Sequence, residues 1–323
     1  YMDGASYEAA LKELIAFHRQ QCPDTRFVFV DQPYFSLTTD PHWETGRILE
    51  NIKAFHQAHQ VVAKEFGFPH VQAHARILND LEAEGELSFG GNVVYPNRDG
   101  SILIAQMVFD ALGGGEAASS SRLKANDRVV FIGDSITDAG RRQPHAGPYG
   151  MGYMRFWRAL LRSRRPQLFH SLVVENRGIG GNTILNLQNR WERDCHDLKP
   201  DHLVVKIGIN DIHRWLSGAP DPISADRYEE IFERILTQTR EQNQECNLVL
   251  LSPFFISRDN NPKSYRKRVL DHLQGYIEGM ERIAGKFDAT TVNLHELFLS
   301  HLDYRPSSAF GNNNGVDVVH PTE

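Results

Sequence analysis

The stretch that decides the fold is Arg128–Asp138, which reads Arg-Val-Val-Phe-Ile-Gly-Asp-Ser-Ile-Thr-Asp. A short apolar, β-branched run leads directly into Gly-Asp-Ser, the pattern of a buried parallel strand that carries polar side chains at its carboxyl end. Ligands of open α/β sheets bind at that end. Ser135 is therefore expected where the chain turns from strand to helix, its hydroxyl directed into a cleft and close to the helix dipole. Taken alone, Gly-Asp-Ser is more typical of an ordinary turn.

The composition is that of a globular protein with one large or two modest domains. The chain has 323 residues, 24% of them charged and 41% hydrophobic, and a net charge of −6. This charge argues against a nucleic-acid partner, and no apolar run reaches the ~18 residues of a membrane helix. We expect neither partner and leave a homo-oligomer open. The chain begins at Tyr1, so a missing signal peptide does not decide export; localisation stays unknown, with the cytoplasm slightly favoured.

The three cysteines, Cys22, Cys195 and Cys246, form an odd and widely spaced set. We expect them to be small buried side chains in a reduced protein, with one disulfide pair as the alternative.

Comparison of the chain with itself shows a duplication of a helix, strand, helix, strand, loop unit. The matching segments are Tyr7-Glu8 with Tyr228-Glu229, Phe27–Phe35 with Leu248–Phe255, and Asn92–Pro96 with Asp317–Pro321. We interpret residues 1–113, which end with a helix expected at 101–112, as the C-terminal half of a degenerate domain. Residues 114–122, rich in glycine and serine, are expected to be a flexible linker. Residues 123–323 are expected to be a catalytic domain that lacks its last helix.

Two further strands of the second copy end in polar or glycine-rich segments. Asn176–Thr183 follows the first, but the third glycine of a dinucleotide-binding G-x-G-x-x-G motif would fall on Thr183, which disfavours nucleotide binding. Gly181 instead lets the backbone approach a ligand and offer its N–H group. Asn210 follows the second strand at the same sheet edge as Ser135. Its amide can donate to a developing oxyanion, although a turn or helix cap is equally consistent; Asp211 is expected to fix the loop.

The last motif is Asp317–Pro321, in which a carboxylate and an imidazole are three residues apart. This spacing lets Asp317 hold one ring nitrogen of His320 while the other faces a hydroxyl. The order Ser, Asp, His along the chain is one of several that give the same triad geometry. The remaining histidines match no zinc-binding spacing, so we expect no metal site.

Together these four blocks resemble the SGNH (GDSL-type) hydrolase family, over roughly 200 residues. The resemblance implies a three-layer α/β/α, flavodoxin-like parallel sheet, here preceded by a partial degenerate copy of the same fold, and no cofactor. It implies that Ser135 is the nucleophile, His320 the general base and Asp317 the partner that orients it. The oxyanion hole would consist of the Ser135 and Gly181 N–H groups and the Asn210 side chain. Asp134, Asp138 and Asp211 are assigned supporting roles.

Within the family, several segments resemble bacterial acetylxylan esterases. They include Gly133–Gly140, Asn176–Thr183 and Ile207–Ile212. This implies an acetylated oligosaccharide or small-molecule ester as the substrate. Val316 departs from that branch, which often has an aromatic residue there, so lipase-like and thioesterase activities stay open, as does a non-catalytic carbohydrate-binding or assembly module. The first copy has Asn92 and Tyr95 in place of Asp317 and His320, and is expected to be catalytically silent.

Overall fold

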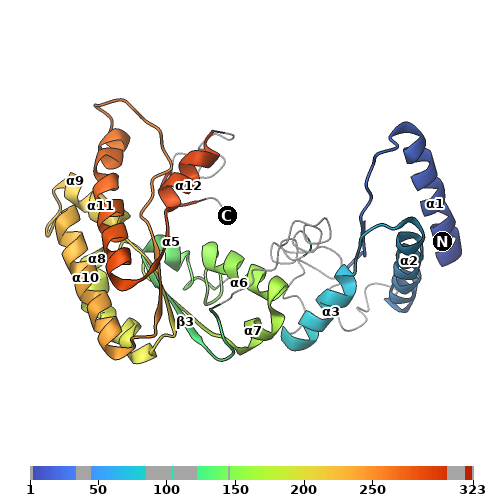
Figure 1. Ribbon diagram of the computed structural model, residues 1–323, viewed down its shortest axis with the longest axis horizontal. Helices are drawn as coiled ribbons and strands as arrows, with labels where there is room; N and C mark the ends of the chain where they lie inside the picture. Colours follow the sequence, from blue (N-terminus) through green and yellow to red (C-terminus); the bar gives the residue numbers. More distant parts are fainter. Residues whose placement is uncertain are drawn as a thin grey trace. The chain divides into compact units, whose positions relative to one another are not determined.

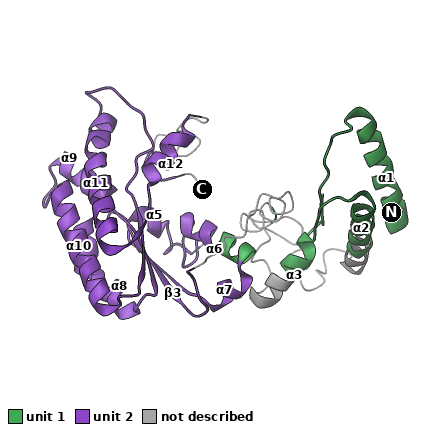
Figure 2. Cartoon of the chain, viewed as in Figure 1, with its two compact units in different colours: residues 1–120, 159–164 green, residues 121–158, 165–323 purple. Residues whose placement is uncertain are grey.

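The structure is a computed structural model that describes residues 3–33, 45–84, 104, 122–144, 146–303 and 317–321. The chain divides into two compact units (Figure 2): unit 1 comprises residues 1–120 and 159–164, and unit 2 comprises residues 121–158 and 165–323. The helix expected at 101–112, apart from Ile104, the linker residues 114–121, Asn92, Tyr95 and Val316 lie outside the described residues.

Unit 2 is built around a sheet of five parallel strands (Figure 1). They are β3 (Arg128–Gly133), β4 (Val173–Gly178), β5 (His202–Lys206), β6 (Asn247–Leu251) and β7 (Thr290–Val292). The order across the sheet is β4-β3-β5-β6-β7. The chain therefore changes direction across the sheet between β3 and β5, and such a switch point is where doubly wound folds bind ligands.

Helices cover both faces of this sheet. They are α5 (Ser135–Asp138), α6 (Tyr153–Arg164), α7 (Pro166–Ser171), α8 (Ile184–Asp194), α9 (Ile209–Ser217), α10 (Ala225–Gln242), α11 (Tyr265–Phe287) and α12 (Leu294–His301), with a 3₁₀ turn at His196–Leu198. Alternate residues of β3 point to opposite faces, as a pleated strand requires. Val130 and Ile132 pack in the cluster that includes α8, α10 and α11, whereas Val129 and Phe131 pack against α6. The three-layer α/β/α fold expected for the second copy is confirmed.

Unit 1 contains α1 (Gly4–Gln21), β1 (Phe29–Val30), α2 (Thr45–Phe66), β2 (His70–Val71) and α3 (Ala73–Glu84), and β1 pairs with β2 in parallel. This order repeats that of α10, β6, α11, β7 and α12. The register agrees as well: Val30 pairs with Val71, and Leu251 pairs with Val292. The residue after the first strand of each pair also donates its N–H to a carbonyl of the second strand. Asp31 donates to Val71, and Ser252 donates to Val292, both at 3.0 Å. These matches are what a duplication requires, and the domain assignment remains our proposal.

The cysteines differ in part from expectation. All three are free thiols; Cys195 and Cys246 are buried, whereas Cys22 is exposed. The expectation for Cys22 is wrong because this residue caps the C-terminus of α1 at the surface of unit 1. Among the described helices, none combines the length and the apolar character needed to cross a bilayer.

Candidate active site

Ser135 lies where β3 passes into α5, as its sequence context predicts. The carboxylate of Asp134 caps α5, because its Oδ1 accepts a hydrogen bond from the Ile136 N–H at 3.0 Å. Gly133 makes the tight turn possible: a Cβ there would lie 2.2 Å from the backbone oxygen of Lys206. The neighbouring strand thus leaves room only for glycine, and the nucleophile candidate is held on a rigid element.

The structure brings Ser135, His320 and Asp317 together across 185 positions of sequence. The Ser135 Oγ lies 2.8 Å from the Nε2 of His320, and the Asp317 Oδ2 lies 2.8 Å from the Nδ1 of the same ring. When the ring proton is on Nδ1, the imidazole donates it to the Asp317 carboxylate, and its Nε2 can accept the proton of the serine hydroxyl. The imidazole and the carboxylate are both partly exposed, so a solvent-borne substrate has access to them.

The turn that carries the imidazole is fixed by its own backbone. The Asp317 Oδ1 accepts hydrogen bonds from the N–H groups of Val319 and His320, both at 3.0 Å. Val318 packs into the core, and its carbonyl accepts from the Ile256 N–H at 2.8 Å. Partial burial would raise the pKa of Asp317, but the bonds from His320 and Val319 outweigh it and hold that pKa below its ordinary value. The carboxylate therefore stays ionised beside the imidazole.

The two remaining oxyanion-hole candidates lie at the same sheet edge, Gly181 in the turn before α8 and Asn210 in the first turn of α9. Gly181 has a φ of 77°, and nothing lies within 4 Å of the place where a side chain would be. The Asn210 Nδ2 donates to the backbone oxygen of Asn182 at 3.1 Å. An amide carries two N–H donors, so one is still available for a substrate oxygen.

Two of the supporting carboxylates take structural positions. Asp211 is fully buried and accepts from the Ile184 N–H at 3.0 Å, which holds the start of α8 to the start of α9. Burial raises the pKa of Asp211 to about 7. Asp138 forms an ion pair with Arg141, in which Oδ1 and Nε are 3.4 Å apart.

A buried ion pair beneath the nucleophile was not foreseen from the sequence. Lys206 and Asp134 are both completely buried, with Nζ and Oδ2 3.2 Å apart. The ammonium group also lies 5.0 Å from the centre of the Phe254 ring. Burial lowers the pKa of Lys206, and the neighbouring Asp134 opposes that shift. The sequence pattern around Lys206 does not show whether this side chain is buried or which residue pairs with it. The pair becomes visible only in the folded structure.

Arg190 of α8 connects three segments of the candidate site. Its guanidinium donates to the carbonyls of Gly133 and Arg177, at the ends of β3 and β4, at 3.0 and 2.8 Å. Its Nε donates to the Asn182 side chain at 2.9 Å. Burial would raise the pKa of Asp194, but hydrogen bonds from Arg193 and Arg190 hold it at about 2, so it remains the counter-ion of Arg190.

A pocket of about 470 Å³ opens beside Ser135 and His320. Apolar side chains line much of it; they are Ile136, Met151, Tyr153, Phe156 and Phe298. Of the described residues in the loop after Gly140, the lining includes Gly140 and Gln143. The reacting pair therefore borders a mainly apolar space.

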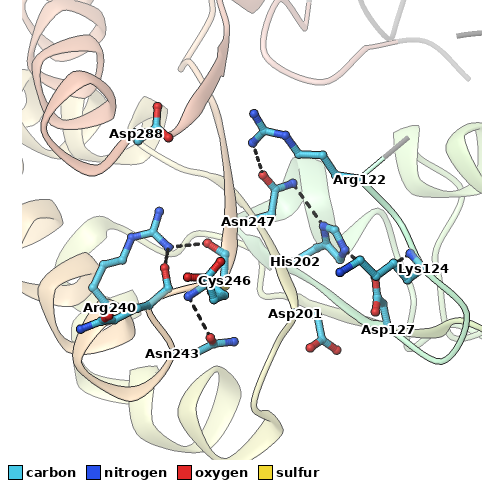
Figure 3. A pocket seen from close by; sticks show the side chains of 12 residues that line it. Arg122, Lys124, Asp127, Asp201, His202, Arg240, Asn243, Cys246, Asn247 and Asp288 are labelled. Atoms are coloured by element: carbon cyan, nitrogen blue, oxygen red, sulfur yellow. Dashed lines mark hydrogen bonds and ion pairs between the residues drawn. The ribbon is translucent and has the colours of Figure 1, made fainter. Parts of the chain in front are cut away.

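A second pocket, of about 440 Å³, lies at the opposite, amino end of the sheet (Figure 3). Its polar groups bond to one another: Asn247 accepts from Arg122 at 2.7 Å and contacts His202 at 3.1 Å, and His202 contacts Asp127 at 2.8 Å. It contains none of the candidate catalytic residues, so the carboxyl end of the sheet is the candidate active site.

The chain is similar in sequence and fold to known esterases. Residues 131–323 match the GDSL-like lipase/acylhydrolase family. An acetylxylan esterase of Geobacillus stearothermophilus is 30% identical over 208 residues, which cover 62% of this chain and 89% of that protein. The crystal structure of an acetylxylan esterase from the same organism aligns with a TM-score of 0.54 at 30% identity, covering 62% of this chain and 90% of that one. LAE5, an alpha/beta hydrolase enzyme from the metagenome of Lake Arreo, Spain, aligns with a TM-score of 0.53 at 30% identity, covering 61% and 88%. The chain belongs to the GDSL-like lipase/acylhydrolase family and is a carboxylic ester hydrolase.

Proposed function

We propose that unit 2 removes acetyl groups from carbohydrate esters through a Ser-His-Asp triad. In the first step Ser135 attacks the ester carbonyl while the Nε2 of His320 takes the hydroxyl proton. The imidazolium returns this proton to the departing alcohol, which leaves an acyl-enzyme. Water then attacks the acyl group by the same relay and releases the acid. The observation that carries the proposal is the pair of 2.8 Å contacts that His320 makes with Ser135 and Asp317.

The negative charge of the tetrahedral intermediate would be stabilised by N–H donors at the sheet edge. We assign this role to the backbone N–H groups of Ser135 and Gly181 and to the free amide hydrogen of Asn210. Each donor lost should lower kcat by about 10²–10³-fold. Asp317 stays ionised and holds His320 in the tautomer that can accept a proton.

The proposed acyl group is acetyl and the proposed alcohol a xylo-oligosaccharide. Support comes from the relative at 30% identity, which is an acetylxylan esterase. The apolar pocket beside Ser135 favours a second candidate, an acyl hydrolase for longer chains, since Phe156 and Phe298 could pack against an alkyl group.

The triad is tested with Ser135→Ala, assayed on 4-nitrophenyl acetate. We expect loss of turnover by about 10⁶-fold with unchanged circular dichroism. The exposed Ser217 provides the control, because Ser217→Ala should keep full activity and should still react with a fluorophosphonate probe at Ser135. Undiminished turnover of Ser135→Ala would refute the assignment. A series of 4-nitrophenyl esters from acetate to octanoate, together with acetylated xylo-oligosaccharides, separates the two substrate candidates.

A further inference from the structure

Unit 1 holds a compact group of two imidazoles and a carboxylate that the esterase reaction does not use. Asp31 follows β1, His59 lies on α2 and His70 begins β2. The Asp31 Oδ1 lies 2.7 Å from the Nε2 of His70 and 3.3 Å from the Nδ1 of His59. One donor atom from each residue lies within 4.8 Å of the other two. Asp31 and His59 are 4% and 8% exposed, so the group is largely removed from water.

The framework of unit 1 does not require these side chains, as the matching part of unit 2 shows. Ser252 follows β6 as Asp31 follows β1. Met280 lies seven residues before the end of α11, as His59 does in α2. In the strand pairing, Thr291 lies opposite Leu250 as His70 lies opposite Phe29. The same arrangement of helices and strands thus forms with a buried hydroxyl, a buried thioether and an exposed hydroxyl at these three places. Unit 1 instead has an acid and two imidazoles at these places, with Asp31 and His59 buried, although the fold can form with uncharged side chains there, which points to a role beyond folding.

We propose that Asp31, His59 and His70 bind a divalent transition-metal ion of the Zn²⁺ type. Two imidazole nitrogens and one carboxylate oxygen are a typical ligand set for this ion, at about 2.0–2.2 Å from it. Three protein ligands leave the fourth tetrahedral position for water or another small ligand.

The orientation of His59 supports this assignment. Its Nδ1 faces the carboxylate, while its Nε2 lies 2.9 Å from the hydroxyl oxygen of Tyr7 on α1. In metal sites the non-ligating ring nitrogen commonly donates to such a partner, which fixes the ring and its tautomer. Tyr7 is thus a positioning residue for the proposed site rather than a ligand.

The alternative is a network of hydrogen bonds without an ion, in which both rings donate to Asp31. Metal titration of the whole chain distinguishes the two. After treatment with a chelator and dialysis, Co²⁺ is added and the visible d–d absorption is recorded, and Zn²⁺ is added in a calorimeter. We expect one tightly bound ion per chain and the intense bands of four-coordinate Co²⁺. Absence of saturable binding in the wild-type chain would overturn the proposal.

Three variants carry the residues that unit 2 has at the matching places: Asp31→Ser, His59→Met and His70→Thr. Each should weaken Zn²⁺ binding at least 100-fold, whereas His18→Gln, at an exposed position on α1, should leave it unchanged. Tyr7→Phe keeps all three ligands and should weaken binding by about 10–100-fold. Circular dichroism reports whether unit 1 still folds, and unchanged esterase activity shows that unit 2 is unaffected. If the ligand variants bind Zn²⁺ like the wild type, the assignment is wrong; if they do not fold, the Co²⁺ spectrum and Tyr7→Phe decide.

Discussion

The buried pair of Lys206 and Asp134 is expected to support both the stability of unit 2 and the position of the nucleophile. At a separation of 3.2 Å and an effective dielectric constant of 20, the attraction between the two charges is about 5 kcal/mol, which offsets the cost of removing both from water. Lys206→Met leaves the carboxylate buried without its counter-charge. We expect this substitution to lower the free energy of unfolding by about 3–5 kcal/mol.

The second substitution, Asp134→Asn, tests whether the unpaired charge is the cause. An amide has no charge and its oxygen can still accept from the Ile136 N–H, so the cap of α5 is kept. The double variant Lys206→Met/Asp134→Asn should therefore be more stable than Lys206→Met alone. Lys286→Met provides the control, because Lys286 pairs with Glu233 at the surface and its loss should cost less than about 1 kcal/mol.

Urea unfolding is followed by tryptophan fluorescence and by the loss of esterase activity, which reports unit 2 alone. The role of the ion pair is refuted if Lys206→Met lowers the free energy of unfolding no more than Lys286→Met does, or if the double variant is no more stable than Lys206→Met alone. Equal losses for Lys206→Met and Lys286→Met would mean that water screens the buried pair. A double variant no more stable than Lys206→Met would mean that the substitution acts through lost packing and not through the unpaired charge.

Three further predictions concern the turn, the buried acid and the triad. Gly133→Ala should prevent folding of unit 2, because its Cβ would clash with the Lys206 carbonyl, while Gly285→Ala, with open space around it in α11, should raise stability by about 0.5–1 kcal/mol; thermal unfolding compares them. Since the pKa of Asp211 is about 7 in the folded chain and 3.8 for an ordinary carboxyl, its protonated form stabilises the fold below pH 4 and this contribution is lost as the pH rises through 7. Between pH 4 and pH 8 the free energy of unfolding of the wild type should therefore fall by roughly 4 kcal/mol from this group, and Asp211→Asn should remove most of that fall. Urea unfolding at the two pH values measures it, and an equal fall in the variant contradicts the prediction. Asp317→Asn should lower kcat by about 10⁴-fold on 4-nitrophenyl acetate, and a loss below tenfold would count against its role.

Much of the fold could be predicted because parallel strands place their carboxyl ends at one edge. The apolar run before Gly133 locates β3, and similar runs locate the strands before Gly178 and Gly208. This rule places Ser135 and Asn210 on either side of the switch point between β3 and β5. The pairing of His320 with Ser135 is instead what the resemblance to the SGNH hydrolases implies, and the structure places their side-chain atoms 2.8 Å apart.

The rest could not be predicted because it depends on distances in space rather than on spacing in the sequence. Lys206 is 72 positions from Asp134, and nothing in the strand around it shows which residue will compensate its charge. The apolar pocket could not be predicted for a similar reason, because it combines the start of α6 with Phe298 of α12, which lies more than 100 positions further along the chain.

The proposed metal site of unit 1 could not be predicted from sequence spacing either. Sequence reasoning expected no metal because a zinc motif is sought as a short local spacing, such as two histidines on successive turns of one helix. Here the two imidazoles of the proposed site are 28 and 39 positions from Asp31 and lie on different elements. Only the parallel pairing of β1 and β2 and the packing of α2 bring them together. The internal match with Ser252, Met280 and Thr291 then separates what this fold needs from what unit 1 has in addition, so the comparison that makes unit 1 a candidate silent esterase domain also marks the place of the proposed metal site.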